Sequence, residues 1–242
     1  MLFTVLFTHP SGQARSPARA RMDVEDDACV DAPSAVFSPK MSQHQHWYHR
    51  LHGGAPSHVL APMVDQSELA YRLLCRRHGT TLCYTPMFSA KQFAESELYR
   101  NTMFGPLDGE GEDRPLVVQF AGHDPASLLA SAKHVQHRCN AVDLNLGCPQ
   151  KIAKRGRYGA WLLHERELLK EIVSTLHCHL DCPVTCKIRL AQEDNFQSSR
   201  ASISETVDLA RMLQGAGASL IARTPSRPIV AGGYVSPSTR HP

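Results

Sequence analysis

The sequence predicts an α/β fold of the TIM (β/α)8 type, present here as an incomplete barrel of about six βα units. Three observations lead to this prediction. Short apolar runs alternate with stretches of helical spacing between residues 58 and 222. The runs are continuous in apolar character, as expected for parallel strands buried on both faces. Polar residues recur where the runs end, which is where barrel enzymes carry their sites. From the pattern alone, a doubly wound sheet is the alternative.

The expected elements follow in order along the chain. The first three strands are predicted at 58–64, 81–87 and 115–121. The first helix covers 66–79 and ends at Gly79, and a short helical piece near 89–98 precedes a polar loop at 107–114. Asp124 and Pro125, a capping residue and a first-turn residue, begin a helix that runs to about Arg138.

The second half repeats the alternation. The fourth strand is predicted at 141–148, and a long loop then leads to a helix near 163–180. The fifth strand is predicted at 183–190, the next helix at 203–215 and the sixth strand at 218–222. The domain prediction is therefore a partial barrel over 58–222, followed by an irregular tail over 223–242 that is rich in Pro, Ser and Gly.

Residues 1–57 are rich in Ser, Pro, Ala, His and Gln without a sustained period, which predicts a disordered N-terminal extension. Residues 1–22 contain three arginines and no acid, a weak likeness to an organelle transit peptide. A mitochondrial location is therefore an alternative to the cytoplasm or nucleus. The apolar start, MLFTVLF, is too short for a membrane span, so no membrane partner is expected.

The composition is that of a globular protein: 242 residues, 42% hydrophobic, 20% charged, with a net charge of +3. Such a small basic excess fits an anionic partner without identifying one. Eight scattered cysteines and no evident secretory signal indicate free thiols in a reducing compartment. A zinc site is a minor alternative, because cysteines and histidines cluster at His177, Cys178, His179, Cys182 and Cys186. A strand beginning near Cys182 would splay these side chains, so no metal is predicted.

The candidate site residues fall at the predicted strand ends, namely Pro62, Met63, Val64, Gln119, Asn145, Cys148, Lys187 and Arg189. An amide within VVQF and an ammonium within TCKIRL are costly to bury without partners. We therefore expect these groups to converge at one barrel mouth.

Each residue also has a structural explanation. Gln119 can satisfy a backbone group, and Lys187 can pair with Asp143 on the adjacent strand. Asn145 can cap the following loop, and Cys148 can be a buried structural thiol.

The set of residues suggests a chemistry. A cysteine is mostly protonated at neutral pH and can act as an acid, and no histidine lies within its motif to make it a nucleophile. A lysine can stabilise negative charge on a reduced flavin, whose polar edge Gln119 and the backbone of 61–63 can bind. A flavin hydride together with a thiol proton would reduce a carbon–carbon double bond.

The run DLNLGCPQ, followed by IAKRG and YGA, resembles the tRNA-dihydrouridine synthases, most closely the eukaryotic type that acts near positions 16 and 17 of the D-loop. Supporting segments are LAPMVDQSELAYRLLCRRHG, LCYTPM, PLVVQFAGHDP and PVTCKIRL, and together they span residues 58–190. The resemblance implies an FMN-binding barrel that reduces uridine in tRNA, with NADPH recharging the flavin.

The resemblance also implies roles. Cys148 would donate the proton to uracil C5, and Asn145 and Arg189 would hold the uracil. FMN would be held by Pro62, Met63, Val64, Gln119 and Lys187. Phosphates of the tRNA would meet Lys151, Lys154, Arg155 and Arg157, whose structural alternative is contact with carbonyls of their own loop. Two other functions stay open: another FMN-dependent ene-type reductase, and a non-catalytic RNA-binding fragment.

The chain departs from the family pattern after the sixth strand. The sequence has Ile221-Ala222-Arg223-Thr224 where the family has His-Gly-Arg-Thr, and no seventh or eighth strand is recognisable. The helical RNA-binding domain of the family is not recognisable in this sequence either. Because the loops after the last two strands form the phosphate site in many barrels, we expect FMN to bind weakly or not at all. We also expect the outer edges of the first and sixth strands to be unpaired.

Overall fold

The computed structural model describes residues 4–6, 47–51, 58–191 and 202–224. The transit-peptide and irregular-tail predictions concern residues that lie almost entirely outside these ranges. Most of the predicted disordered extension lies outside them as well. Within the described residues, no helix is both long enough and apolar enough to cross a membrane.

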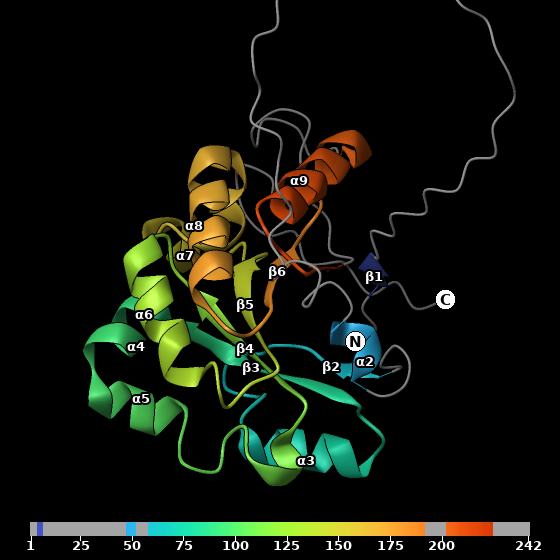
Figure 1. Ribbon diagram of the computed structural model, residues 1–242, viewed down its shortest axis with the longest axis vertical. Coiled ribbons are helices and arrows are strands. Elements are labelled where there is room, and N and C mark those ends of the chain that lie inside the picture. Colours follow the sequence, from blue (N-terminus) through green and yellow to red (C-terminus); the bar gives the residue numbers. More distant parts are fainter. Residues whose placement is uncertain (1–3, 7–46, 52–57, 192–201, 225–242) are drawn as a thin grey trace, which may run out of the picture.

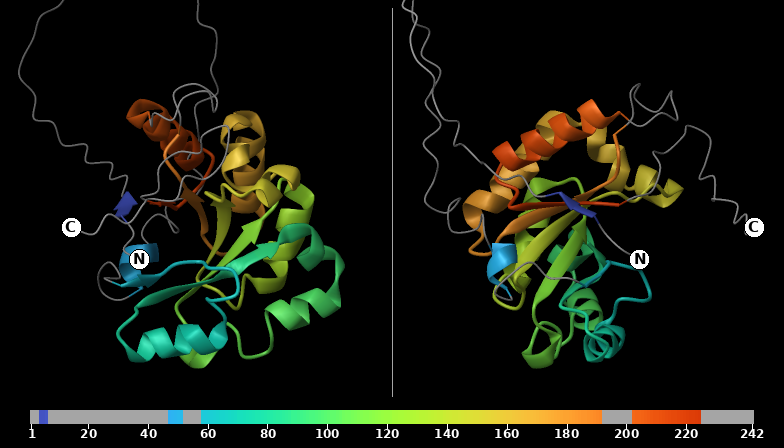
Figure 2. Two further views of the ribbon diagram at one scale, coloured as in Figure 1. Left: turned by 180° about the vertical axis from the view of Figure 1, so that it is seen from behind. Right: turned by 90° about the vertical axis from the view of Figure 1, so that its right-hand side faces the viewer.

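The described residues form one sheet of seven strands, in the order β1-β7-β6-β5-β4-β3-β2. Six strands are parallel, and each apolar run predicted as a strand contributes one: β2 Val59–Leu60, β3 Leu82–Ser89, β4 Leu116–Ala121, β5 Ala141–Leu146, β6 Val184–Ile188 and β7 Leu220–Arg223. The sheet is curled, and helices cover its outer side (Figures 1 and 2). The predicted partial TIM barrel is confirmed.

The helices lie between the strands as the alternation requires: α3 Leu69–Arg77, α4 Ala90–Glu95, α5 Glu97–Met103, α6 Pro125–Val135, α7 Lys151–Arg155, α8 Arg166–His179 and α9 Ile203–Gly215. Local capping explains several starts. The Asp124 carboxylate accepts from the Ser127 backbone N–H at 2.8 Å, so the predicted cap of α6 is confirmed. Ser202 caps α9 in the same way by accepting from the Glu205 backbone N–H.

Three segments differ most from prediction, and the predicted fourth and fifth strands also stop early, at Leu146 and Ile188. The first strand stops at Leu60 rather than 64, because Pro62 has no N–H and the chain turns at Met63. The second strand continues to Ser89, with a register shift between Tyr84 and Met87, where Pro86 interrupts the ladder. The predicted long loop after Cys148 contains α7 and a 3-10 helix, η2 Gly159–His164.

The two faces of the sheet bury different cores. The outer face packs a large apolar cluster against the helices, including Val118, Leu144 and Ile188. The inner face carries a smaller cluster that includes Val117, Ala141 and Leu220. Its remaining partners include Trp47 and Tyr48 of α2 Trp47–Arg50, which lie in the segment predicted to be disordered. Two aromatic rings bury enough area to hold this short helix against the inner face.

The outer edge of β7 is paired, which corrects the expectation of an open edge there. β1 Thr4–Leu6 runs antiparallel to it, with Thr4 opposite Arg223 and Leu6 opposite Ile221. In the described part of the chain, β2 at the other end of the sheet has β3 as its one neighbouring strand. An added antiparallel strand satisfies backbone groups that a parallel edge would leave unpaired.

A buried arginine fastens α3 to the segment before β4. The Arg72 side chain is 1% exposed and donates to both carboxylate oxygens of Asp113, at 2.8 and 2.6 Å. It also donates to Asp108 and to the Ser67 carbonyl. Because the carboxylate of Asp113 is equally buried, the guanidinium of Arg72 is the charge that compensates it.

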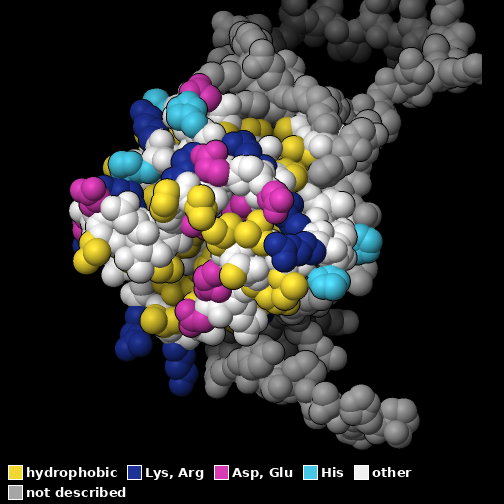
Figure 3. All heavy atoms as spheres, turned by 90° about the horizontal axis from the view of Figure 1, so that it is seen from below, with side chains coloured by type: hydrophobic (Ala, Val, Ile, Leu, Met, Phe, Trp, Pro, Cys, Tyr) yellow, Lys and Arg dark blue, Asp and Glu magenta, His cyan; other side chains and the backbone are white. Residues whose placement is uncertain are grey.

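The surface over these elements shows no single-sign patch. Figure 3 shows acidic, basic and hydrophobic side chains interspersed on the face that carries α3 and α5. We therefore assign this face no electrostatic role and look for the site at the strand ends.

We expect Arg72→Ala to lower the free energy of unfolding by about 3–5 kcal/mol, because it leaves a buried carboxylate uncompensated. Urea or guanidinium titration measures this. The control is Arg166→Ala, which removes an exposed pair with Glu205 and should change stability by about 0–1 kcal/mol. Equal losses in the two variants would contradict the assigned role of Arg72.

Candidate active site

The polar strand residues share the inner face of the curled sheet. Side chains alternate along a strand, so residues two apart face the same way. Gln119 lies opposite Asp143, and Asp143 lies opposite Thr185 in the next strand. One step toward the carboxyl ends, Asn145 lies opposite Lys187. Two rows of polar residues therefore cross the inner face above the apolar cluster. One row is Gln119, Asp143 and Thr185, and the other is Asn145 and Lys187.

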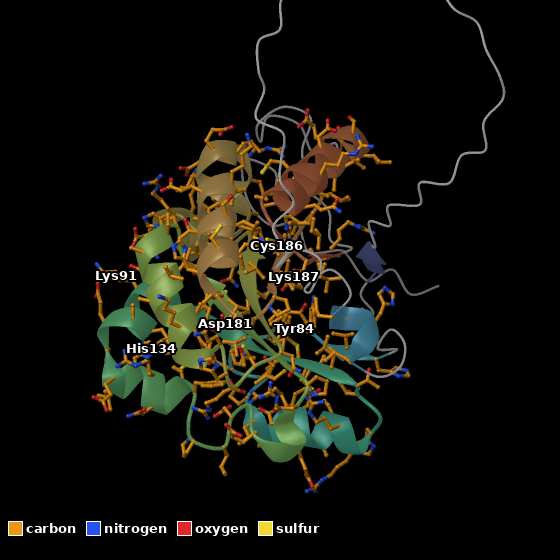
Figure 4. All side chains as sticks on the ribbon, in the orientation of Figure 1. Tyr84, Lys91, His134, Asp181, Cys186 and Lys187 are labelled. Carbon is orange, nitrogen blue, oxygen red and sulfur yellow. The ribbon has the colours of Figure 1, made fainter. Side chains whose placement is uncertain are left out.

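Gln119, Asn145 and Lys187 of these rows line the floor of a pocket of about 680 Å³ at the carboxyl ends of the strands, and Asp143 and Thr185 lie beneath it. All eight strand-end residues predicted for the site line it: Pro62, Met63, Val64, Gln119, Asn145, Cys148, Lys187 and Arg189. Figure 4 shows Lys187 toward the middle of the molecule, whereas Lys91 and His134 lie at its periphery. The structure therefore brings the predicted groups together in one hollow of ligand size.

Asn145 holds the turn that carries the thiol. Its Oδ1 accepts from the backbone N–H groups of Gly147, at 3.1 Å, and Cys148, at 3.0 Å. Its Nδ2 donates to Gln119 Oε1 at 2.9 Å and contacts Met87 Sδ at 3.3 Å. The loop-capping alternative for Asn145 is thus also true, since one amide both caps the turn and lines the pocket.

The loop after α7 closes on the same turn. The Ala160 N–H donates to the Cys148 carbonyl at 3.0 Å. Gly159 has φ +70°, and a Cβ there would lie 2.5 Å from the Cys148 carbonyl oxygen and 2.9 Å from its Cβ. Arg157 also has a positive φ, of 49°, which costs a non-glycine residue some strain. This close approach fixes the backbone of Cys148 from its second side.

Burial governs the charged groups on the floor. Burial raises the pKa of Asp143 to about 6, against the opposing hydrogen bonds from Thr185 and Gln119 and the charge of Lys187. Burial lowers the pKa of Lys187, and the charge of Asp143 partly offsets this. The carboxylate oxygens of Asp143 accept hydrogen bonds from Gln119 and Thr185, and Lys187 acts on this carboxylate through its charge.

Two binding groups are engaged within the chain. The Met63 N–H donates to the Ser67 hydroxyl, and the Met63 carbonyl accepts from Ser67. The Met63 N–H, which was expected to bind the edge of a flavin ring together with its neighbours, therefore has a hydrogen-bond partner within the chain. Arg189 is 6% exposed and donates from Nε to the Gly147 carbonyl at 2.8 Å, which directs it along the turn that carries the thiol.

The four predicted basic residues lie on α7 and just after it, and all are exposed. Two have partners within the chain: Lys154 lies 4.7 Å from the centroid of the Trp161 ring, and Arg157 pairs with Glu165 at 2.7 Å. Exposed ion pairs contribute little, so these cations can exchange partners at low cost.

Sequence reasoning missed several residues of the site. Tyr158 lines the pocket. Burial raises the pKa of its hydroxyl, and the charge of the neighbouring Cys148 raises it further. Its signal in the sequence was an aromatic ring within a basic run and close to two glycines. Thr185 was missed because an isolated threonine in a strand is ordinary. Met87 and Thr224 also line the pocket.

A second hollow of about 670 Å³ lies beside the pocket. The two share Val64, Met87 and Tyr158, and the second hollow is further lined by residues after β3 and β4, including Tyr99 and His123. The pocket therefore opens sideways along the strand ends.

The zinc alternative finds no support among the described residues, where no group of three His, Cys, Asp or Glu side chains could hold a metal ion. Cys182 and Cys186 are buried, and His177 packs against Gly217. The Cys182 side chain interacts with that of Cys139, and Cys186 lies one residue from Lys187 on β6.

The residues present fit a planar heteroaromatic group. The pocket volume lies within the usual range of roughly 300–1,000 Å³ for cofactor and ligand sites. Lys187 and Arg189 offer cationic donors, and Gln119 and Asn145 offer amides that remain in fixed orientation. A flavin ring, which gains negative charge on reduction, matches this set of donors.

A curled parallel sheet with helices outside and polar residues at its carboxyl ends defines the class of (β/α)8-barrel proteins. Within that class, the family model for dihydrouridine synthases matches residues 59–227, and the chain belongs to that family.

Individual relatives agree. The chain is 50% identical over 168 residues to the tRNA-dihydrouridine(16/17) synthase [NAD(P)(+)] of Saccharomyces cerevisiae, covering 69% of this chain and 38% of the relative. It is 50% identical over 183 residues to a protein of that type in Rattus norvegicus, covering 76% and 39%. A human tRNA-dihydrouridine(20a/20b) synthase-like protein is 36% identical over 174 residues, covering 71% and 51%. The chain thus spans about 40–50% of the relatives it matches.

We expect Gly159→Ala to destabilise the chain by about 2–4 kcal/mol, because a Cβ would both meet the Cys148 backbone and require a strained φ. Alkylation of Cys148 by iodoacetamide, followed by peptide mass spectrometry, should change in rate.

The control is Gly79→Ala, whose φ is +91° but whose Cβ would meet nothing within 4 Å. It should cost about 1–2 kcal/mol and leave the alkylation rate of Cys148 unchanged. If both variants alter the thiol equally, the close approach of Gly159 is not what positions it.

Proposed function

We propose that this chain carries the catalytic part of a tRNA-dihydrouridine synthase of the 16/17 type, which reduces uridine to 5,6-dihydrouridine in the D-loop. The observation that supports it most directly is the convergence of a thiol, two amides and two cations in one pocket at the strand ends. The family match and the names of the relatives point to the same reaction.

In this proposal each side chain has a defined task. Cys148 holds the proton that is delivered to uracil C5, since a thiol can act as a general acid. Asn145 holds the turn beneath the thiol and faces the uracil. Arg189, held by the Gly147 carbonyl, offers its guanidinium to the uracil oxygens.

The cofactor is proposed to be FMN, reduced by NADPH, and when bound it supplies the hydride for uracil C6. Gln119 and Lys187 hold the polar edge of its ring, and Pro62, Met63 and Val64 pack against it. Lys187 suits the reduced ring because a buried ammonium stabilises negative charge strongly at short range.

The nucleic-acid partner is proposed to be tRNA, so the protein would act in the cytoplasm or nucleus. The target base must leave its stack to enter the pocket. The basic residues of α7 and its following loop lie at the rim, where they would meet phosphates. The second hollow, with Tyr99 and Tyr158 in its lining, gives room beside the pocket for a flanking base.

The two alternative functions, an ene-type reductase and a non-catalytic RNA-binding fragment, account for fewer features of the pocket. A reductase of small free substrates has no use for four exposed cations beside its pocket. A non-catalytic RNA-binding fragment does not need a thiol held on two sides by Asn145 and the Gly159 loop.

We expect Cys148→Ala to lower dihydrouridine formation by at least about 100-fold, because it removes the proton donor. The measurement is mass spectrometry of tRNA from cells that lack this activity and express the chain with excess FMN. Cys178→Ala, which removes an exposed thiol at the end of α8, is the matched control. Unchanged product from Cys148→Ala would contradict the proposal, and tRNA binding without product from the parent chain would favour the fragment.

Replacing Lys151, Lys154 and Arg155 with Gln should weaken tRNA binding. It should also flatten the dependence of the logarithm of affinity on the logarithm of salt concentration, by roughly 0.7–0.9 for each phosphate that is no longer neutralised. Filter binding over a salt series measures both quantities. The control replaces Lys133, Lys170 and Arg211, exposed cations on α6, α8 and α9, with Gln. Equal effects from both triple variants would mean that binding follows net charge rather than this rim.

A further inference from the structure

We propose that Asp143 is a positioning residue: its carboxylate sets the direction of a hydrogen-bond chain that runs through Gln119 and Asn145 to the backbone N–H of Cys148. The inference rests on the proposed function for its catalytic meaning. Its physical content concerns only the described residues and can be tested without cofactor or substrate.

The chain begins at a group that can only accept. An ionised carboxylate has no hydrogen to donate, so both of its neighbours must turn their donors toward it. The Thr185 hydroxyl donates to Asp143 Oδ1 at 2.5 Å, and Gln119 Nε2 donates to Asp143 Oδ2 at 2.8 Å. The carboxylate is 0% exposed, so water does not compete for it.

Each following step has one permitted direction. With its NH₂ on the carboxylate, Gln119 presents Oε1 to Asn145, which donates from Nδ2 at 2.9 Å. Asn145 must then present Oδ1 to the turn, where it accepts from the N–H groups of Gly147 and Cys148. If either amide turned over, like groups would face each other at a buried contact, at a cost of about 1–3 kcal/mol.

An uncharged residue at 143 would not impose this direction. An asparagine can present either its oxygen or its NH₂ to Gln119, and the Thr185 hydroxyl can donate or accept in compensation. The N–H groups of Gly147 and Cys148 would still require an oxygen from Asn145, because a backbone N–H can only donate. The carboxylate therefore fixes from the β5 end the same direction that the turn requires at the other end, and an uncharged residue at 143 would leave the turn as the one remaining constraint.

The charge state of Asp143 decides whether the direction is fixed from both ends of the hydrogen-bond chain or from the turn alone. Burial raises its pKa to about 6, against hydrogen bonds from Thr185 and Gln119 and the charge of Lys187. The other titratable neighbours are Tyr84 on β3 and Cys186 on β6, and burial together with the charge of Asp143 raises the pKa of each.

The raised pKa of Asp143 determines how its contribution to stability changes with pH. The folded chain binds this proton more tightly than an unfolded one, so the contribution of Asp143 to stability is fully present below about pH 4 and is lost as pH rises through about 6. The constraint that Asp143 places on the direction behaves oppositely, since both of its oxygens can only accept above about pH 6, whereas below it the N–H groups of Gly147 and Cys148 are the remaining constraint. Asp143 thus costs stability at neutral pH while ordering the site.

The test follows the side-chain amide resonances of Gln119 and Asn145 by NMR between pH 5 and 8, assigned from the peaks that disappear in Gln119→Met and Asn145→Ala. In the wild-type chain, both should move with one shared midpoint near pH 6. In Asp143→Asn, neither should move in this range. Thr185→Val is the matched control: it removes a hydrogen bond that favours the ionised carboxylate, so both resonances should still move together with a higher midpoint.

Three results would overturn the proposal. They are resonances that stay fixed in the wild-type chain, resonances that still titrate in Asp143→Asn, and movement of Gln119 without Asn145. In a tRNA reduction assay, Asp143→Asn should lower kcat by about 10-fold and leave KM for tRNA unchanged, and a change in KM alone would contradict a positioning role. Because the NMR result needs neither flavin nor tRNA, it stands or fails independently of the proposed reaction.

Discussion

A carboxylate buried among amides and a hydroxyl organises the inner face of the curled sheet. The two-residue period of a strand directs every second side chain inward, so polar residues there must satisfy one another. Asp143 begins this arrangement, and the hydrogen bonds through Gln119 and Asn145 carry it to the turn that holds Cys148. The apolar cluster beneath, which α2 completes with Trp47 and Tyr48, excludes water from the other side.

The backbone of Cys148, which carries the thiol, is held by contacts from two directions. The residues around these contacts include unfavourable features that lower the stability of the fold. Asn145 accepts two N–H groups below the turn, and the Gly159 segment presses on the Cys148 carbonyl from above. The positive φ of Arg157 and the buried charge of Asp143 are unfavourable features concentrated around one side chain. Such concentration is typical of functional sites, where placement of a group takes precedence over stability.

Much of this could be predicted from the sequence, since parallel strands buried on both faces leave continuous apolar runs. α9 and the capped start of α6 agree with their predicted positions. The position of the pocket could also be predicted, because the carboxyl ends of parallel strands meet at one edge of the sheet. Direction within the polar rows could not be predicted, since residue type does not show which way an amide turns. The helix α2 could not be predicted either, because its two aromatic residues pack against inner-face residues that are far from them in the sequence.

The pairing of β1 with β7 has a consequence for biosynthesis. It joins Thr4 to Arg223, two residues that lie far apart in the sequence. Contacts between segments so far apart form slowly, because the intervening chain must be ordered first. During translation the apolar segment around β1 therefore waits without its native neighbour, and holdase chaperones that recognise short extended apolar peptides have their best opportunity there.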